Sequence, residues 1–523
     1  MFVVDFYKVQ IKRIEKIAKF ATIGLVVYLL CFGAASVLFP IRPFWNDEWR
    51  LIYNIKFKDY EALWGRLDLL QECPRVYLSL LKFISSNFDY SYTSLRMPPF
   101  IIGVASVFLL FYLQRKFFPR RQALHYLFIL ILVSSQTFTD YLTQVKQYEM
   151  DIFLCLVALW QLFVLLEISR EGIKNRLQYA LVCIIFWAVP YLSYTYPIVV
   201  APIYPVILLA SFSKTNFPGN RIRHFSSLYA PLVLAALSIL AFYLVDVQHV
   251  MSDKNMYDSY LKVYYDGGKP NVFQNFWNLF ALIGSGFLFE VIFGVLGIAG
   301  FGYAAYRILR KKINTFTLLD YFTVYALALL VLVLCLLFTG KIVGGVARLT
   351  AYTVPSISIL IITLLEDLRA KYGFVKLSKG IAAVLFIGLA GNIITSCINT
   401  FTYSEYKRRI TTYLHTAKAL KEARLRNVPF LYTDGVCGDQ WEVAAPVPGT
   451  ISRYTITPRQ IAGADTVAAE VIVKVNPEYK VWDSIPLYYM PDSKWMAEYV
   501  KQLPDSLQRA MVGDGINYQI REK

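Results

Sequence analysis

The chain has 523 residues, of which 57% are hydrophobic and 16% aromatic, and its formal net charge is +17. Its mean hydropathy is +0.46, and a soluble domain of this size could not cover so much apolar surface with polar side chains. Lys and Arg gather in short segments between long apolar runs, which is typical of membrane topology signals and of contacts with anionic lipid rather than with nucleic acid.

The N-terminal segment is basic and amphipathic and predicts a helix on the cytoplasmic surface. A first membrane helix over Phe20–Phe39 then leads outward. A first outer loop follows, covering about residues 41–98. Its apolar stretch over 76–84 is too short to cross a bilayer, so it predicts an interfacial helix.

Ten more apolar runs predict membrane helices. The second is expected near 100–113, the third and fourth flank an outer turn at 140–148, and the fifth and sixth flank an outer turn at 193–196. The seventh leads to an outer loop over 248–277, and the last covers 380–398. Every second connection is short and rich in Lys and Arg. This alternation predicts an all-α bundle of about eleven helices in the inner (plasma) membrane, with the N-terminus cytoplasmic and the C-terminus periplasmic or extracellular.

The tail changes character at Tyr403. A charged stretch over 405–426 predicts a helix, and Phe430–Thr433 and Val471–Val475 predict strands. We therefore expect a transmembrane domain over 1–402 and a small α/β domain outside the membrane over 403–523. Of the seven cysteines, only Cys73 and Cys437 are expected outside, where they either pair or stay as free thiols.

Two adjacent carboxylates, Asp47 and Glu48, lie a few residues beyond the first membrane helix, between Trp45 and Trp49. Tryptophan prefers the membrane interface, and a carboxylate beside a low-dielectric surface binds protons more readily unless a cation is close. Such a group can act as a general base or bind a metal, and Mg²⁺ or Mn²⁺ is left open here. The alternative is a solvated loop anchored by ordinary interfacial tryptophans.

The outer turn before the fourth helix places ionisable groups at the membrane boundary, and these are Asp140, Lys146 and Asp151. An ionisable group at the start of a membrane helix is a functional candidate by default, whereas the simpler interpretation is a solvated hairpin or a local Lys146–Asp151 pair. Arg348 stands at the outer start of the tenth helix. Its guanidinium could hold a phosphate with two parallel hydrogen bonds, or could reach toward lipid headgroups.

These segments together resemble the GT-C superfamily of membrane glycosyltransferases, specifically the protein O-mannosyltransferase and aminoarabinose-transferase group (glycosyltransferase families 39 and 83). The matching motifs are Asp47-Glu48, Cys73-Pro74-Arg75-Val76-Tyr77, Leu95-Arg96-Met97-Pro98 before the second helix, Gln144-Val145-Lys146-Gln147-Tyr148, and Arg348 with Pro355. The resemblance covers the first four helices well and the others mainly by topology. The chain departs from the family at Cys73-Pro74-Arg75, where His-Pro-Pro or Lys-Pro is more usual, and at Leu349, where an aromatic residue is usual.

The resemblance implies an inverting glycosyltransferase that takes a sugar from undecaprenyl or dolichyl phosphate and transfers it to a glycan, lipid or protein. It implies that Asp47 is the base and that Glu48 orients the acceptor or a metal. The residues expected to hold the donor phosphate are Lys146, Arg348, Arg75 and Tyr148. Asp140 and Asp151 are candidates for a second carboxylate.

Two other functions fit a chain of this topology. A flippase or transporter of lipid-linked saccharides would need ionisable residues at mid-membrane and broken helices. A saccharide polymerase or ligase would typically carry its base in a large late loop. The ionisable residues singled out here lie at the outer boundary, and the candidate base lies in the first loop, so both alternatives rank below the transferase.

The alternating Lys/Arg-rich connections predict that the C-terminus is outside the cytoplasm. A C-terminal alkaline phosphatase fusion should be active, and a C-terminal fluorescent protein exported through the Sec route should be dark. The opposite pair of results would contradict the topology and an active site on the outer face.

Overall fold

The structure is a computed structural model that describes residues 2–39, 44, 46–67, 71–118, 123–213, 221–248, 271–281, 283–284, 287–342, 347–370, 375–402, 430–433, 451–453, 469–475 and 516–522. Its chain divides into two compact units. The first comprises Met1–Leu38, Trp64–Arg66 and Glu72–Cys397, and the second comprises Phe39–Leu63, Leu67–Gln71 and Ile398–Lys523. The predicted boundary at 402/403 falls near the start of the last segment, and the division into 1–402 and 403–523 stays a prediction.

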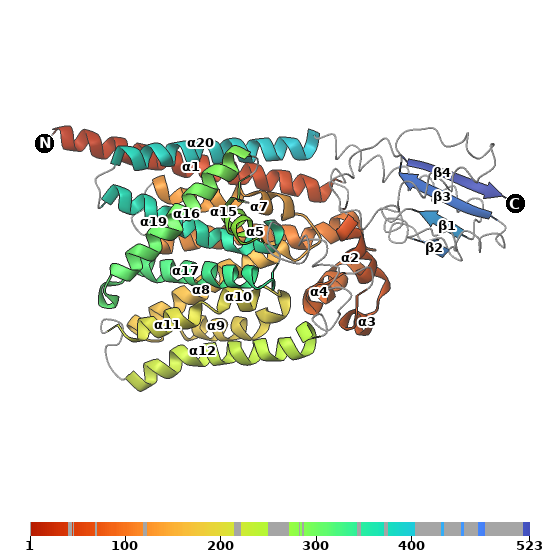
Figure 1. Ribbon diagram of the computed structural model, residues 1–523, viewed down its shortest axis with the longest axis horizontal. Helices are drawn as coiled ribbons and strands as arrows, with labels where there is room; N and C mark the ends of the chain where they lie inside the picture. The colour runs from red at the N-terminus through yellow and green to blue at the C-terminus, as the bar shows by residue number, and fades with distance from the viewer. Residues whose placement is uncertain are drawn as a thin grey trace. The chain divides into compact units, whose positions relative to one another are not determined.

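The first unit is a helical bundle whose long helices run side by side (Figure 1). Its elements are α1 (Phe2–Leu38), α4 (Arg75–Ser86), α5 (Tyr92–Phe117), η1 (Ala123–Tyr126), α6 (Leu127–Val133), α7 (Gln136–Tyr141), α8 (Tyr148–Glu171), α9 (Arg176–Ala188), η2 (Val189–Leu192), α10 (Tyr196–Val200), α11 (Ile203–Ser211), α12 (Arg221–Phe242), η4 (Tyr243–Val247), α15 (Val272–Ala281), α16 (Phe287–Arg310), η6 (Ile313–Thr315), α17 (Leu318–Phe338), α18 (Ala347–Thr350), η7 (Ala351–Thr353), α19 (Val354–Ala370) and α20 (Val375–Thr402).

Among the described residues, eight helical segments are long and apolar enough to cross a membrane. They are Ile14–Leu38, Tyr92–Phe117, Tyr148–Glu171, Ser226–Val247, Phe287–Arg310, Leu318–Phe338, Arg348–Ala370 and Gly380–Cys397. Three shorter apolar helical segments, Ala123–Val133, Arg176–Leu192 and Tyr196–Ser211, stand where the third, fifth and sixth membrane helices were predicted. The predicted fold class is therefore confirmed, and the chain is a multi-pass membrane protein.

The second unit contains α2 (Asn46–Phe57), α3 (Tyr60–Trp64, of which Trp64 falls in the first unit), the end of α20 from Ile398 onward, and four strands. The strands are β1 (Phe430–Thr433), β2 (Ile451–Arg453), β3 (Ala469–Val475) and β4 (Ile516–Glu522), and they form one sheet in the order β2-β1-β3-β4. β1 pairs in parallel with β2 and β3, whereas β3 and β4 are antiparallel. The two predicted strands are present, and the helix predicted over 405–426 lies outside the described residues.

Three predicted boundaries differ from the structure. The stretch around Asp47, predicted as loop, forms the start of α2. The second membrane helix begins at Tyr92 rather than near 100, because Ser91 caps it by accepting the Ser94 amide at 3.3 Å, so the Leu95–Pro98 motif lies inside the helix. The outer loop predicted over 248–277 is helical from Val272 onward.

The third membrane helix is broken into η1, α6 and α7 rather than continuous. Ser135 caps α7 by accepting the Phe138 amide at 3.3 Å. The Asn392 amide group, from α20, donates to the Ser134 carbonyl at 2.7 Å. A helix can break at membrane depth only where other groups satisfy the freed backbone, and Asn392 does so here.

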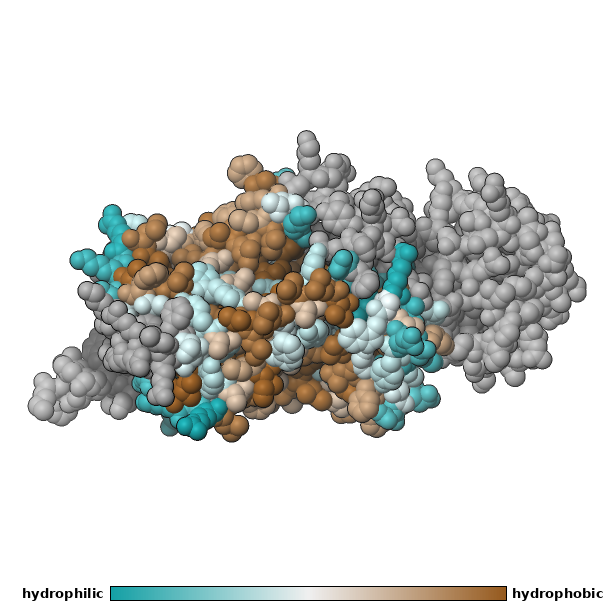
Figure 2. All heavy atoms as spheres, turned by 90° about the horizontal axis from the view of Figure 1, so that it is seen from below, coloured by the Kyte–Doolittle hydropathy of each residue, from teal (hydrophilic) through white to brown (hydrophobic). Residues whose placement is uncertain are grey.

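Helices α8 and α19 lie at the centre of the bundle and are buried along most of their length. α8 packs against α5, α10, α11 and α12, and α19 packs against α6, α16 and α17. In Figure 2, apolar side chains dominate the middle of the helical unit and hydrophilic ones gather toward its ends.

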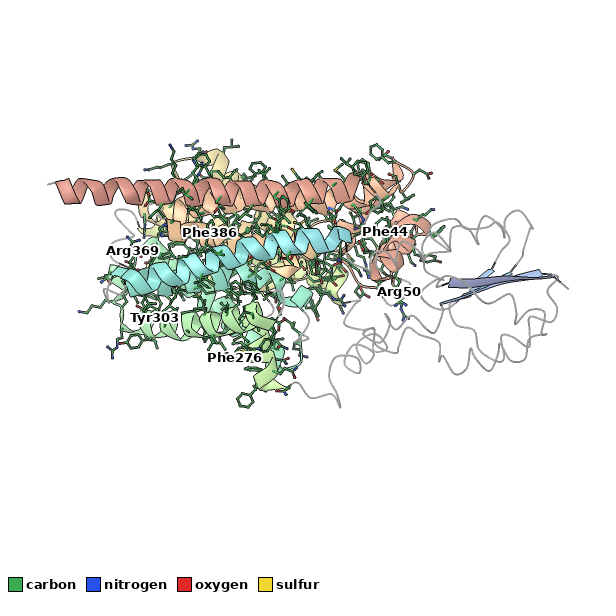
Figure 3. The ribbon with its side chains drawn as sticks, turned by 90° about the horizontal axis from the view of Figure 1, so that it is seen from above. Phe44, Arg50, Phe276, Tyr303, Arg369 and Phe386 are labelled. Carbon is green, nitrogen blue, oxygen red and sulfur yellow. The ribbon has the colours of Figure 1, made fainter. Side chains whose placement is uncertain are left out.

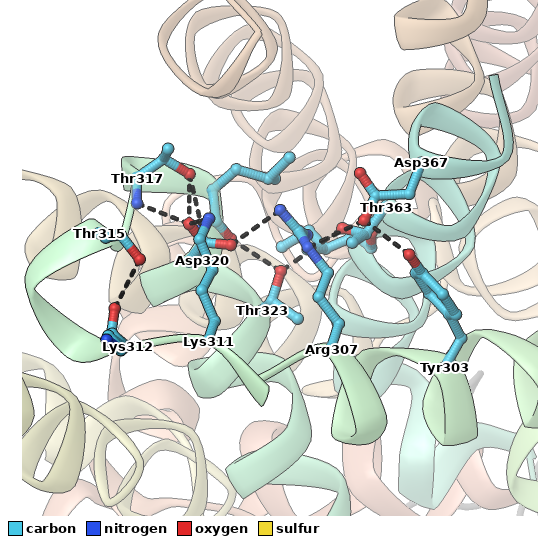
Figure 4. Close-up of polar contacts among 12 residues, drawn as sticks. Tyr303, Arg307, Lys311, Lys312, Thr315, Thr317, Asp320, Thr323, Thr363 and Asp367 are labelled. Atoms are coloured by element: carbon cyan, nitrogen blue, oxygen red, sulfur yellow. Dashed lines mark hydrogen bonds and ion pairs between the residues drawn. The ribbon is translucent and has the colours of Figure 1, made fainter. Parts of the chain in front are cut away.

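An ion-pair network joins α16, α17 and α19 at one end of the bundle (Figure 4). The Arg307 guanidinium lies 2.8 Å from an Asp320 oxygen and 3.0 Å from an Asp367 oxygen. Asp320 also accepts from Lys311 and completes a capping box with Thr317 at the start of α17. Tyr303 donates to Asp367 at 2.8 Å, and Figure 3 shows Tyr303 and Arg369 toward this same end.

Asp320→Asn should destabilise the bundle. Asp320 is fully buried, so the substitution leaves Arg307 without one of its two carboxylates. Breaking a buried ion pair costs on the order of 3 kcal/mol. Differential scanning fluorimetry in detergent should show a clear fall in Tm.

The matched control is Glu171→Gln, which breaks an exposed Lys174–Glu171 pair at 2.8 Å. Exposed pairs contribute little, so this variant should keep the wild-type Tm. Equal Tm values for the two variants would show that the Arg307 network is not a stability determinant.

Candidate functional site

Two of the predicted motifs are hydrogen-bonded to each other. The Tyr77 hydroxyl donates to the Lys146 carbonyl at 3.1 Å, and the Cys73 thiol donates to Gln147 Oε1 at 3.3 Å. Tyr77 and Cys73 are both fully buried. The start of α4 is therefore attached at two points to the turn that carries Lys146.

A third motif holds the same turn from another side. Arg96, fully buried in α5, donates through Nη1 to the Thr143 carbonyl at 2.6 Å. Its guanidinium also lies 4.8 Å from the centre of the Tyr92 ring. Residues 142–147 are not helical, so their carbonyls are not all paired as in a helix. Arg96 and Tyr77 supply donors from outside the turn for the carbonyls of Thr143 and Lys146.

Three of the residues predicted to hold phosphate lie around the start of α8. Lys146 is only 6% exposed and precedes the helix by two residues, and Tyr148 is its first residue. The Arg348 guanidinium lies 5.8 Å from the centre of the Tyr148 ring, a cation–π distance. Positions 146, 148 and 348, which are far apart in sequence, thus form one group.

Arg75, the fourth residue predicted to hold phosphate, is engaged in the protein itself. Its side chain is 2% exposed and lies 3.3 Å from a Glu72 oxygen and 3.9 Å from an Asp246 oxygen. It also donates to the Cys73 carbonyl at 2.9 Å. Two carboxylates already balance this guanidinium, so the geometry favours a structural role for Arg75.

Asp151 is buried and lies in the first turn of α8. It accepts a short hydrogen bond from the Ser193 hydroxyl, which in turn accepts from the Thr195 amide at 3.0 Å. The connection between η2 and α10 thus holds this carboxylate. Asp140 lies in α7 and is partly buried. The role of a second carboxylate stays a prediction for both Asp151 and Asp140.

Several charged groups surround the Cys73 thiol. Burial raises the pKa of Cys73 well above its usual range, and the positive charges of Lys146 and Arg75 offset this only partly. The carboxylates of Asp151 and Asp246 raise the pKa further. Cys73 is a free, buried thiol, and Cys437 lies outside the described residues.

The candidate base belongs to the second unit. Asp47 and Glu48 are in the first turn of α2, where negative charge is favourable for the helix dipole. Glu48 is 1% exposed and shares a helix face with Leu51, Ile52 and Ile55, which are fully buried. Glu48 is thus part of a packed face rather than of a solvated loop. Within the described residues, no three His, Cys, Asp or Glu side chains form a group that could hold a metal ion.

Sequence reasoning missed Asp246. It lies in the π-helical segment η4, is 3% exposed, and accepts from the Arg75 amide at 3.0 Å and from the Tyr194 hydroxyl at 2.9 Å. Burial and the charge of Asp246 raise the pKa of Tyr194 well above its ordinary value, which keeps Tyr194 a hydrogen-bond donor. The signal was present, because Asp246 is a lone acid inside an apolar run and π-helical turns are frequent at functional sites.

Residues 73–245, about a third of the chain, match the family described as dolichyl-phosphate-mannose-protein mannosyltransferase. The fold is similar to that of ArnT from Cupriavidus metallidurans bound to undecaprenyl phosphate, with a TM-score of 0.52 and 12% identity over 88% of this chain and 94% of that chain. The resemblance to GT-C membrane glycosyltransferases is confirmed. The family match includes the motifs from Cys73 to Tyr148, whereas Asp47 and Arg348 lie outside it.

A second solved structure is similar at a lower TM-score. The Archaeoglobus fulgidus oligosaccharyltransferase in complex with Zn and sulfate matches at a TM-score of 0.44 and 13% identity over 86% of this chain and 67% of that chain, which is too distant to carry an argument. A comparison with curated proteins finds no match. At 12% identity, the likeness to ArnT shows the fold alone.

The raised pKa of Cys73 predicts that this thiol reacts slowly, because the thiolate is the reactive form. In a variant that keeps Cys73 and replaces the other six cysteines with serine, a membrane-impermeant maleimide at pH 8 should label the folded protein far more slowly than the denatured protein. Fast labelling of folded protein would contradict the burial of Cys73 against Gln147.

Proposed function

We propose that this protein transfers a sugar from a polyprenyl-phosphate donor to an acceptor on the outer face of the membrane. The family match over residues 73–245 and the fold shared with ArnT, whose crystal structure holds undecaprenyl phosphate, support a membrane glycosyltransferase with a lipid-linked donor. The observation that carries the proposal is the meeting of Lys146, Tyr148 and Arg348 at the start of α8.

The donor phosphate is proposed to bind at this group. Lys146 brings a positive charge into a buried turn, and Arg348 adds a guanidinium that suits bidentate binding of phosphate. The N-cap residue of α8 is Gln147, whose side chain does not cap the helix. Two buried carboxyl groups, Glu149 and Asp151, already lie in the first turn of α8, so the proposed binding depends on the two side-chain cations rather than on the helix dipole.

The proposed reaction is a single displacement. Asp47 takes the proton of the acceptor hydroxyl, the acceptor oxygen bonds to the anomeric carbon of the sugar, and the bond from that carbon to the phosphate oxygen breaks. The electron pair leaves with the polyprenyl phosphate, and the anomeric configuration inverts. Lys146 and Arg348 stabilise the charge that grows on the leaving phosphate, and Glu48 orients the acceptor.

The acceptor is proposed to be a hydroxyl of a glycan, lipid or protein in the cell envelope. Mass analysis of envelope glycans and glycolipids from cells with and without this chain should reveal one sugar modification that depends on it. Identical profiles, together with no transfer from lipid-linked sugars by the purified protein, would contradict the proposal.

Lys146→Ala and Arg348→Ala should weaken donor binding more than they slow turnover. Both side chains would touch the phosphate before as well as during the reaction, so most of the loss should appear as a raised KM for the donor. Steady-state transfer assays with purified protein and lipid-linked sugar measure this. Tyr148→Phe keeps the ring against Arg348 and so tests the tyrosine hydroxyl separately. Unchanged donor affinity in both alanine variants would remove Lys146 and Arg348 as phosphate ligands.

Asp47→Asn should abolish most of the turnover and leave donor binding intact. The amide keeps the size of the carboxylate but cannot take up the acceptor's proton, and general-base catalysis contributes about 10²–10⁴-fold. Glu48→Gln should cost less, because Glu48 is proposed only to orient the acceptor. Transfer assays and donor-binding measurements on the same preparations separate the two effects.

A thermal-shift control is needed for both carboxylate variants. Near-normal turnover by a well-folded Asp47→Asn protein would refute Asp47 as the base. Asp140 or Asp151 would then be the next residues to test.

A further inference from the structure

Asp246 connects parts of the chain that no sequence motif links. Its carboxylate accepts from the Arg75 amide at 3.0 Å and from the Tyr194 hydroxyl at 2.9 Å. The same carboxylate lies 3.9 Å from Arg75 Nε. Since Asp246 is only 3% exposed, these contacts are shielded from water. One side chain in η4 thus joins the start of α4 to the connection between η2 and α10.

The Asp246 carboxylate caps the start of α4, which has no side-chain cap of its own. The residue before α4 is Pro74, which makes no side-chain cap. The first amides of a helix have no partner within the helix, and a carboxylate there also interacts favourably with the helix dipole. Asp246 provides this carboxylate from a segment about 170 residues further along the chain. The start of α4 therefore depends on Asp246 for its position.

The start of α4 is also hydrogen-bonded to the non-helical segment that carries Lys146. Cys73 donates to Gln147, and Tyr77, two residues beyond Arg75, donates to the Lys146 carbonyl. A shift of Arg75 away from Asp246 would move Cys73 and Tyr77 with it, and would release two of the contacts that shape the turn.

We propose that Asp246 is a positioning residue for donor binding, acting through α4 on the turn that carries Lys146. This inference rests on the proposed function. Asp246 lies just beyond the segment that matches the mannosyltransferase family, so that match assigns it no role. The same geometry makes Arg75 part of the support, balanced by Glu72 and Asp246, rather than a phosphate ligand.

The test compares Asp246→Asn with a matched variant at the other end of the bundle. Asparagine keeps the size of the side chain and can still accept from Tyr194, but it loses the charge that faces Arg75 and the start of α4. The control is Asp367→Asn, because Asp367 is also a carboxylate that joins helices through an arginine and a tyrosine, at 3.0 Å and 2.8 Å. Both variants should have a lower Tm than the wild type.

Donor binding should separate the two variants. For Asp246→Asn, the Kd for undecaprenyl phosphate and the donor KM should rise roughly tenfold, with kcat within about twofold of wild type. For Asp367→Asn, Kd and KM should stay at wild-type values. Tyr194→Phe removes one hydrogen bond to Asp246 and should raise Kd by a smaller factor, which provides a second test if Asp246→Asn does not fold.

The outcomes distinguish this inference from the proposed function. Wild-type protein that fails to bind undecaprenyl phosphate would overturn both. Normal wild-type binding, with unchanged Kd in Asp246→Asn and Tyr194→Phe, would overturn the positioning role alone. An equal rise in Kd for Asp367→Asn would also overturn it, because the effect would then follow from any loss of stability.

Discussion

A charge buried at the end of an apolar helix bundle must be balanced inside the protein, and much of this structure follows from that constraint. Removing ions from water costs several kcal/mol each, so a buried arginine persists only with partners in good geometry. Arg307 lies between Asp320 and Asp367, and Arg75 lies between Glu72 and Asp246. In both cases the carboxylates come from different segments. The requirement for charge balance therefore fixes helix ends relative to one another.

The contacts described above for Arg307 and Arg348 are nevertheless of different kinds. Arg307 is paired with the carboxylates of Asp320 and Asp367, and these ion pairs connect α16 with α17 and α19. In α18, which precedes α19, the Arg348 guanidinium lies 5.8 Å from the centre of the Tyr148 ring, a contact that adds no negative charge. Lys146 adds a second positive charge to the same group. An aromatic ring against a guanidinium adds no negative charge of its own, which is compatible with the phosphate site proposed above.

The sequence predicts much of this fold because long apolar runs must become membrane helices, and the runs near 100–113 and 380–398 did so. It failed where the structure depends on partners distant in the chain. The break between α6 and α7 at Ser134 is stabilised by Asn392, and no local sequence pattern predicts that contact. The candidate site shows the same division. Its motif residues could be named in advance. Asp246 stands out in the sequence as a lone acid in an apolar run, but its role could not be predicted, because that role consists of bonds to Arg75 and Tyr194.

The turn before α8, residues 142–147, explains why the motifs that contain Tyr77, Arg96 and Lys146 occur together in this chain. Irregular backbone near the membrane is stable only when protein groups donate hydrogen bonds to its carbonyls, since lipid tails offer no donors. Arg96 and Tyr77 satisfy the carbonyls of Thr143 and Lys146, and both donors are buried. A continuous helix through this segment would need neither donor, but it would bond the Lys146 carbonyl within the helix and place the lysine side chain on a helical face. The donors in α4 and in α5 are thus the physical requirement for a lysine held in a non-helical turn at the start of α8.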